Sequence, residues 1–507
     1  MPTLLCGSGR SVSILGQGSR RCPSLGSEGV NIAKWPGGLT SKEAQETQGA
    51  PELLVKARGG QAFFNRKSEM SGLRTRFRTL PRIWLLTGPT NSGKSTILQQ
   101  LQYDSEDQSD KQDREGKAQP IMYLDMRAQD MLAAERFASA LEAAFTPFSE
   151  QTLRGVKLVF NTVWKAIKPM APTPGHEGVD KLNQTMATVE GFLKKRSSRQ
   201  RPVIVVDSAH LLQGWSSESE EERLALSSLL HWCVRITKQQ QLAHVVLSTA
   251  DGLLCYWLEQ ELGRGHMRKL QIGDLPEKEA RQFFELALLP KVGDAELEQK
   301  GRSDEVWKMV YSVCGGRIHN LQQCVADAAA ENCFKRGLQG IVMDAVMDVR
   351  AGLQPVTMVS KNIGRNTNVK PDWSPAQWAK VVKTLLEADG CAVPALEMEK
   401  VLGENGPTAL YSMVRMEMLH YCTPCPLLGS APEGSGAAVS SSLGQDEHAI
   451  VDRDNVDAVV TAISPAHLYA MWQLREMGVL EVEDLEHQHD SGREQHESQG
   501  SANGSEE

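Results

Sequence analysis

The residues with the clearest chemical potential lie between positions 88 and 96, where a glycine turn precedes a lysine and two hydroxyl side chains. This stretch reads Gly88, Pro89, Thr90, Asn91, Ser92, Gly93, Lys94, Ser95 and Thr96. A triphosphate needs several donors aimed at one point, and glycines let backbone N–H groups curl around it at the positive end of a helix. In this pattern Lys94 would reach the β and γ phosphates, and Ser95 would give Mg²⁺ a hydroxyl ligand. The spacing therefore predicts a site for ATP and Mg²⁺.

The elements that must position this turn are a strand before it and a helix after it. Residues 83–87 form an apolar run, and residues 94–101 have the pattern of a helix start. With these flanks the stretch matches a Walker A motif. A chance match in a strand, turn and helix is the alternative interpretation.

A second apolar run, at residues 203–207, ends in Asp207. A central parallel strand places such a carboxylate at the carboxyl edge of its sheet. There Asp207 would hold Mg²⁺ and its water shell opposite Ser95, which is the Walker B role. An apolar run that ends in aspartate is common, so the prediction depends on the Walker A motif upstream. Ser95 and Asp207 are the predicted metal ligands.

These motifs resemble those of P-loop ATPases of the AAA+ and STAND type, and in particular the archaeal-type ATPases. Phe63, Arg66 and Glu69 have the F-x-x-R-x-x-E spacing of a segment that packs near the adenine in those families. A capped surface helix with its arginine and glutamate in solvent is the alternative. The resemblance implies a parallel sheet with a small helical lid, and nucleotide-gated conformational change.

The resemblance also implies two residues that face the γ-phosphate. Ser248 or Thr249 ends the apolar run 244–249 at the place of a sensor residue, and a strand-end cap is the alternative. Arg317 follows two glycines at a place where relatives put a lid residue near the phosphates, although the same sequence also suits a turn between helices. The predicted catalytic residues are Lys94, Asp207, Ser248 and Arg317.

The chain departs from the family pattern directly after Asp207. Relatives that hydrolyse ATP carry a glutamate there, which orients the attacking water, whereas this chain has Ser208. Because a serine hydroxyl is no comparable base, we predict slow hydrolysis or a base from elsewhere. The candidates are His210, which also suits a helix surface, and Glu218, Glu220, Glu221 and Glu222.

Composition limits the class of protein. The chain has 507 residues, of which 40% are apolar, and no apolar run reaches the ~18 residues that a membrane span needs. The net charge of −8 equals that of the tail 481–507, which contains nine acidic residues and one arginine. The remainder is near neutral, which does not favour nucleic acid. The ten cysteines are scattered and do not look like a disulfide framework, which is typical of an intracellular protein.

Residues 1–40 resemble a mitochondrial or plastid transit peptide, with a disordered leader of a cytoplasmic protein as the alternative.

We predict an α/β fold, a P-loop NTPase parallel sheet with a helical lid, followed by a winged-helix-like α+β module. Residues 104–119 are expected to be an exposed insertion, and Asp274 is expected to cap the first lid helix. The predicted divisions are a disordered leader at 1–58, the NTPase core at 59–275, the lid at 276–349, a linker at 350–373, the winged-helix-like domain at 374–482 with a disordered insertion at 426–448, and an acidic disordered tail at 483–507.

The pattern favours an ATP-dependent conformational switch with a protein partner or self-association. An ATP-binding scaffold without turnover is one alternative, favoured by Ser208. An origin-recognition-like, nucleic-acid-binding ATPase is another. It would need a basic recognition helix, and the expected helix at 406–418 carries Arg415 beside Glu417.

Overall fold

A computed structural model describes most of the chain between residues 54 and 480. The described ranges are 54–56, 62–64, 66–110, 119–127, 133–152, 177–195, 201–216, 219–263, 265–355, 371–422 and 458–480. The predicted acidic tail and the predicted insertion at 426–448 lie outside them, as does the predicted leader except for residues 54–56. Those three residues form β1 (Leu54–Lys56), which pairs antiparallel with β2 (Ala62–Phe64). This part of the predicted leader is therefore a strand.

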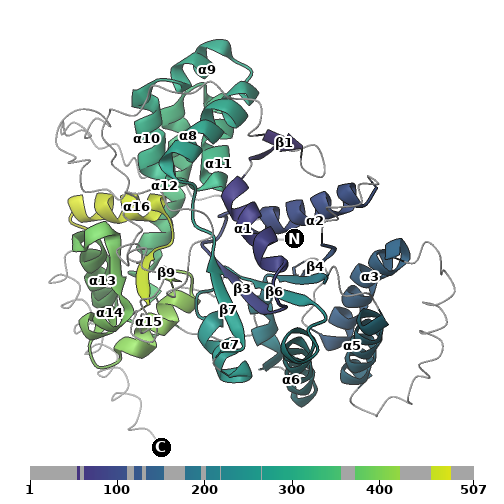
Figure 1. Cartoon of the computed structure of the whole chain (residues 1–507). Helices are drawn as coiled ribbons and strands as arrows, with labels where there is room; N and C mark the ends of the chain where they lie inside the picture. Colours follow the sequence, from purple (N-terminus) through teal and green to yellow (C-terminus); the bar gives the residue numbers. More distant parts are fainter. Residues whose placement is uncertain are drawn as a thin grey trace, which may run out of the picture.

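A five-stranded parallel sheet forms the centre of the molecule (Figure 1), as the α/β prediction required. Its order is β4-β5-β6-β3-β7, with β3 (Ile83–Thr87), β4 (Ile121–Asp125), β5 (Val203–Asp207), β6 (His244–Ser248) and β7 (Met267–Gln271). Strands β3, β5 and β6 are buried along their whole length, because helices cover both faces of a parallel sheet. The edge strand β4 is buried only at alternate residues.

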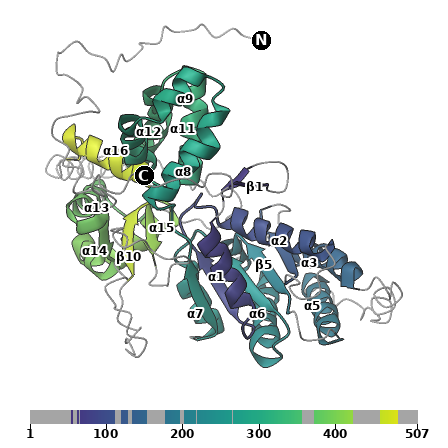
Figure 2. The same ribbon diagram turned by 45° about the horizontal axis from the view of Figure 1, so that its top comes forward.

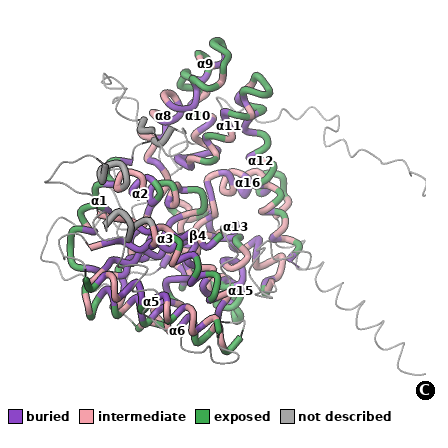
Figure 3. Tube along the Cα trace, turned by 90° about the vertical axis from the view of Figure 1, so that its right-hand side faces the viewer, coloured by how far each residue is buried: buried purple, intermediate pink, exposed green. Residues whose placement is uncertain are grey.

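Two sets of helices cover the sheet, and Figure 3 shows buried, intermediate and exposed residues along these helices. One apolar core joins α1 (Lys67–Phe77) and α2 (Lys94–Asp110) to Val203, Val205 and Val246. A second core joins the other face to α3 (Ala134–Thr152), α5 (Glu177–Lys195), α6 (Glu220–Val234) and α7 (Leu254–Leu262). Alternate residues of a strand point to opposite faces, so Asp207 and Ser248 share the α2 face with these three valines.

Helix α2 is longer than predicted and includes the first residues of the expected insertion. Its Gln100 donates a hydrogen bond to Asp104 at 2.7 Å, and Asp104 is also paired with Arg74 of α1. The helix continues to Asp110, so the prediction of an exposed insertion from residue 104 is wrong. Residues 111–118 lie outside the described part of the chain.

The carboxyl-terminal half consists of helices and one small sheet. The lid helices are α8 (Glu277–Phe283), α9 (Ala295–Gly301), α10 (Asp304–Cys314), α11 (Ile318–Glu331) and α12 (Phe334–Ala351). The winged-helix-like module contains α13 (Pro375–Glu387), β8 (Ala392–Pro394), α14 (Ala395–Leu402), α15 (Gly406–Arg415), β9 (Leu419–Cys422), β10 (Val459–Ala462) and α16 (Pro465–Glu476). Its antiparallel sheet has the order β8-β10-β9. Strand β8 was not predicted, because three residues that end in proline give almost no strand signal.

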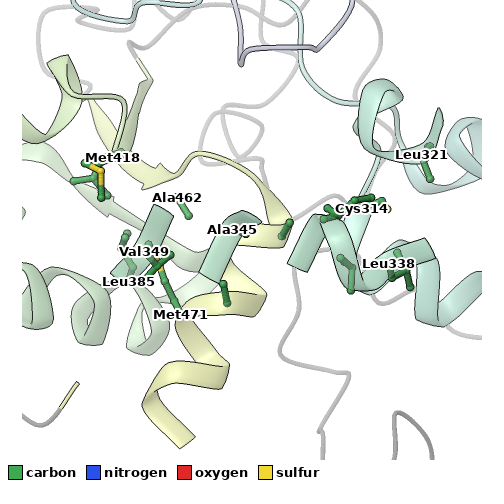
Figure 4. Close-up of a cluster of buried hydrophobic side chains, with 14 of the residues drawn as sticks. Cys314, Leu321, Leu338, Ala345, Val349, Leu385, Met418, Ala462 and Met471 are labelled. Carbon is green, nitrogen blue, oxygen red and sulfur yellow. The ribbon is translucent and has the colours of Figure 1, made fainter. Parts of the chain in front are cut away.

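The lid and the winged-helix-like module share one apolar core. Val349 of α12, Leu385 of α13 and Met471 of α16 meet there (Figure 4). The indole nitrogen of Trp378 donates to the carbonyl of Val349 at 2.8 Å, and that of Trp373 donates to Gly352 at 3.0 Å. The two ends of the predicted linker therefore pack against α12 and α13. The lid and the winged-helix-like module form one body, which Figure 2 shows beside the parallel sheet and its helices. Residues 356–370 lie outside the described ranges.

No helix in the described ranges is long and apolar enough to cross a membrane.

The contact between Gly316 and the β7–α8 connection gives a stability prediction. A β-carbon at Gly316 would lie 1.8 Å from the carbonyl oxygen of Leu275. We expect Gly316→Ala to lower the free energy of unfolding by about 3 kcal/mol, since two backbone segments would have to separate. The control is Gly191→Ala in α5, where a β-carbon meets nothing within 4 Å and helix propensity should raise stability by about 0.5–1 kcal/mol. Thermal unfolding followed by circular dichroism measures both, and equal midpoints would contradict this account.

Candidate functional site

The glycine turn of residues 88–93 joins β3 to α2, so the motif has the strand and helix that the sequence predicted. Gly88 and Gly93 have positive φ angles of 155° and 91°, which favour glycine. A β-carbon at Gly88 would also lie 2.1 Å from the carbonyl oxygen of Ile272. The turn can therefore keep its shape only with glycine at position 88.

Lys94 lies inside this turn, and only 7% of it is exposed. Its Nζ donates to the carbonyls of Gly88 and Pro89, both at 2.8 Å, and lies 3.5 Å from Ser92 Oγ. Burial lowers the pKa of Lys94 to about 8, although the nearby carboxylate of Asp207 acts to raise it. The ammonium group is thus poorly solvated and would gain from an anionic partner.

Asp207 lies at the carboxyl edge of the sheet, as predicted for a Walker B aspartate. Its Oδ2 accepts a hydrogen bond from Tyr123 at 2.6 Å and lies 3.4 Å from Arg127 Nη2, and its Oδ1 accepts from the backbone N–H of Ser208 at 3.0 Å. Ser208 has a positive φ of 58°, which is uncommon for serine. The carboxylate is therefore held from the β4 side by Tyr123 and Arg127 and by the backbone of the residue that follows it.

Ser248 is the neighbour of Asp207 on β6 and is completely buried. Within the described residues its hydroxyl oxygen has no hydrogen-bond partner, and an orphaned polar atom of this kind suits a site that receives a polar ligand. Thr249 accepts from the backbone N–H of Asp251 at 2.9 Å, and its Oγ1 lies 3.4 Å from Nδ1 of His210. Of the two hydroxyls, Ser248 is thus the better sensor candidate.

Arg317 brings the lid to the glycine turn. It precedes α11, and its Nη1 donates to the carbonyl of Thr90 at 3.1 Å. Its Nε and Nη2 donate to the two carboxylate oxygens of Asp274 at 2.9 and 3.0 Å. The expectation that Asp274 caps the first lid helix is wrong, because the residue before α8 is Pro276 and it makes no side-chain cap. Asp274 instead fixes the guanidinium of Arg317.

The upstream segment is buried, which excludes the solvated surface helix. Arg66 is 2% exposed, and its Nη1 donates to Glu69 at 3.2 Å and to the carbonyl of Gly273 at 2.9 Å. Burial lowers the pKa of Arg66. Two of its nitrogens have no partner among the described residues. The side chain of Phe63 lies outside the described part.

Two of the predicted replacements for the missing glutamate make other contacts. Glu221 accepts from the backbone N–H of Gly178 at 2.8 Å, and Glu222 accepts from that of Ala134 at 3.1 Å. Both carboxylates thus hold the amino-terminal ends of α5 and α3, where they complement the helix dipole. Glu220 is exposed at the start of α6, and Glu218 lies outside the described residues. Glu221 and Glu222 begin α6, which packs on the sheet face opposite α2 and Asp207, and this position argues against them as bases.

Two titratable side chains near the site were not identified from the sequence. Asp125 ends β4 and is the cross-strand neighbour of Asp207, and an apolar run that ends in aspartate was the signal that could have found it. His420 on β9 is partly buried, and this burial together with the charges of Arg317 and Lys94 lowers its pKa to about 4. No local pattern marks His420, since only the packing of the winged-helix-like module brings it there.

Comparison with known sequences agrees with this geometry. A family described as an ATPase domain predominantly from Archaea matches residues 63–324, which is just over half of the chain. An uncharacterized ATP-binding protein of Methanocaldococcus jannaschii is 24% identical over 272 residues, which cover 50% of this chain and 67% of that protein. A second such protein from the same organism is 23% identical over 292 residues, which cover 54% of this chain and 75% of that protein.

Among solved structures, the Walker-type ATPase of Pyrococcus abyssi aligns with a TM-score of 0.46 and 12% identity, covering 82% of this chain and 97% of that one. The family match includes the glycine turn, Asp207, Ser248 and Arg317. The chain therefore belongs to the family of ATPase domains found predominantly in Archaea.

Proposed function

We propose that this protein binds Mg-ATP at the glycine turn, hydrolyses it slowly, and uses it as a conformational switch of the STAND type. The observation that carries the proposal is the meeting of Lys94, Asp207 and Arg317 at one turn, from α2, β5 and the lid. Lys94 and the first-turn N–H groups of α2 would bind the phosphates. Arg317 would turn from Thr90 to the γ-phosphate.

The residues also fit a magnesium ion. Ser95 and Asp207 offer the hard oxygen ligands that Mg²⁺ prefers, and water and phosphate oxygens usually complete its octahedron. Within the described ranges no group of three or more His, Cys, Asp or Glu side chains could hold a metal by itself, which suits an ion bound together with its nucleotide. When bound, the ion would neutralise charge on the phosphates.

The contacts of the carboxyl-terminal half support a switch. Arg317 ties the lid to the glycine turn, and the lid shares its core with the winged-helix-like module. That module in turn contacts the loop after β6, where a β-carbon at Gly252 would lie 1.8 Å from the carbonyl oxygen of Tyr421. A movement of the lid that carries Arg317 toward the phosphates would be transmitted to this contact, because the lid and the module share one core. A protein partner or a second copy of the chain would bind to the conformation that results.

The same contacts disfavour the nucleic-acid alternative. Arg415 is the basic residue of α15 and would have to face DNA in a recognition helix. Its side chain is only 12% exposed, pairs with Asp251 at 3.2 Å and also bonds Gln213. Because this arginine is held on the ATPase core, α15 offers no basic face. The scaffold alternative is favoured only by Ser208.

Hydrogen exchange with and without Mg-ATP tests the switch. We expect nucleotide to increase exchange of β9, of α15 and of the loop at Gly252, because lid closure breaks their contact. Lys94→Ala should abolish this response, and Arg415→Ala should increase exchange of α15 without nucleotide. Bound nucleotide that leaves exchange of these segments unchanged would favour the scaffold, and phosphate release equal in wild type and Lys94→Ala would exclude an ATPase.

A further inference from the structure

The site contains a second carboxylate beside the Walker B aspartate. Asp125 and Asp207 end neighbouring strands, and they are directly paired in the register of the parallel sheet. Residues so paired point to the same face, which here is the face of α2. The side chain of Asp125 is 23% exposed and that of Asp207 is 3% exposed. Asp125 can therefore reach solvent, as a group that activates water must.

One guanidinium group shows how close the two carboxylates are. Arg127 donates to Asp125 Oδ1 through Nε at 3.0 Å and to Oδ2 through Nη2 at 3.1 Å. The same Nη2 lies 3.4 Å from Asp207 Oδ2. Both carboxylates thus lie against a single nitrogen atom. Asp125 is within a few ångströms of the predicted metal ligand, on the side away from β6.

Tyr123 connects this pair to the helix that follows the glycine turn. Its hydroxyl donates to Asp207 at 2.6 Å and accepts from Gln99 of α2 at 3.3 Å. A phenol keeps its proton at neutral pH, so the Tyr123 hydroxyl acts as the donor to Asp207. The position of Asp207 is thereby tied to α2, the helix that follows the glycine turn.

We propose that Asp125 is the general base of ATP hydrolysis in this protein, in place of the glutamate that Ser208 replaces. This inference rests on the proposed ATPase function. The water oxygen forms a bond to the γ-phosphorus while the bond from that phosphorus to the β,γ-bridging oxygen breaks. The electron pair of the broken bond remains on the bridging oxygen, which leaves as part of ADP. One proton of the water passes to the Asp125 carboxylate and then to solvent. Arg127 keeps the carboxylate oriented between turnovers.

Asp125→Asn separates this role from structure and from nucleotide binding. The amide keeps the shape of the side chain and cannot accept the proton, so we expect kcat for phosphate release to fall about 100-fold. The KM for ATP and the affinity for a fluorescent ATP analogue should stay within about twofold of wild type. The substitution does not change contacts that bind the ground state and the transition state equally. Asp125→Glu, which restores a carboxylate, should recover at least about a tenth of the activity.

The matched control is Asp304→Asn, which changes an exposed aspartate that accepts from Arg281 at 2.7 Å far from this pair. It should leave kcat unchanged. An Asp125→Asn protein with wild-type kcat would overturn the assignment, as would an equal loss of nucleotide affinity or no recovery by Asp125→Glu. Those results would not affect the proposed conformational switch. A wild-type protein whose hydrogen exchange does not respond to Mg-ATP would instead refute the proposed function itself.

Discussion

Replacement of Lys94 by alanine is expected to weaken Mg-ATP binding about 100-fold at pH 7, or by about 3 kcal/mol. The ammonium group would exchange two carbonyl acceptors at 2.8 Å for charged phosphate oxygens, and the attraction between opposite charges makes the new bonds stronger than those to neutral carbonyls. Isothermal titration calorimetry with Mg-ATP measures the effect. An affinity within threefold of wild type would exclude Lys94 from the phosphate site.

The control for this change is Lys300→Ala. Lys300 is an exposed lysine of α9 that pairs with Glu296 at 2.6 Å. Its loss should leave the affinity for Mg-ATP unchanged, which excludes a general effect of net charge.

The same lysine predicts how ATP affinity depends on pH. Burial lowers the pKa of Lys94 to about 8 in the ligand-free protein, and a bound triphosphate would raise it. Below pH 8 the ammonium is already protonated, so affinity should be constant. Above pH 8 binding must take up a proton, and affinity should fall about tenfold per pH unit until the pKa of the complex is reached. Lys94→Ala should remove this dependence. A wild-type affinity that stays constant up to pH 9.5 would contradict the assignment.

Replacement of Arg317 by alanine is expected to lower kcat for ATP hydrolysis by about 10²–10³, the usual effect of losing one donor to the transition-state charge. Arg317 already touches the glycine turn at Thr90 and is 6% exposed, so a small movement of the lid would bring it to the γ-phosphate. The KM for ATP should change less than kcat. The measurement is steady-state phosphate release, and turnover as fast as in wild type would make Arg317 a structural residue only.

Two variants control for the structural role of Arg317. Arg317→Lys keeps the charge and loses the two-pronged bond to Asp274, because an ammonium has no planar fork, so it should retain part of the activity. Asp274→Asn keeps the guanidinium while it removes the carboxylate that fixes it at 2.9 and 3.0 Å. It should lower kcat less than Arg317→Ala does.

The sequence by itself determined the nucleotide-site scaffold. The glycine turn lies between the strand and helix predicted for it, and Asp207 ends a buried parallel strand. Both predictions succeed because they depend on local chemistry. Only glycine accepts the backbone shape at Gly88, and a β-branched run suits a strand that is buried on both faces. The roles of these residues in catalysis stay predictions.

Tertiary structure decided what the charged side chains around that scaffold do. Asp274 looked like a helix cap and instead holds Arg317. Glu221 and Glu222 looked available as bases and instead hold the ends of helices from distant parts of the chain. Long polar side chains bond to whatever the fold brings within reach, and spacing in the sequence does not encode such partners. Asp125 meets Asp207 across 82 residues only because two strands pair in the sheet, and His420 reaches the site only because a separate module packs there.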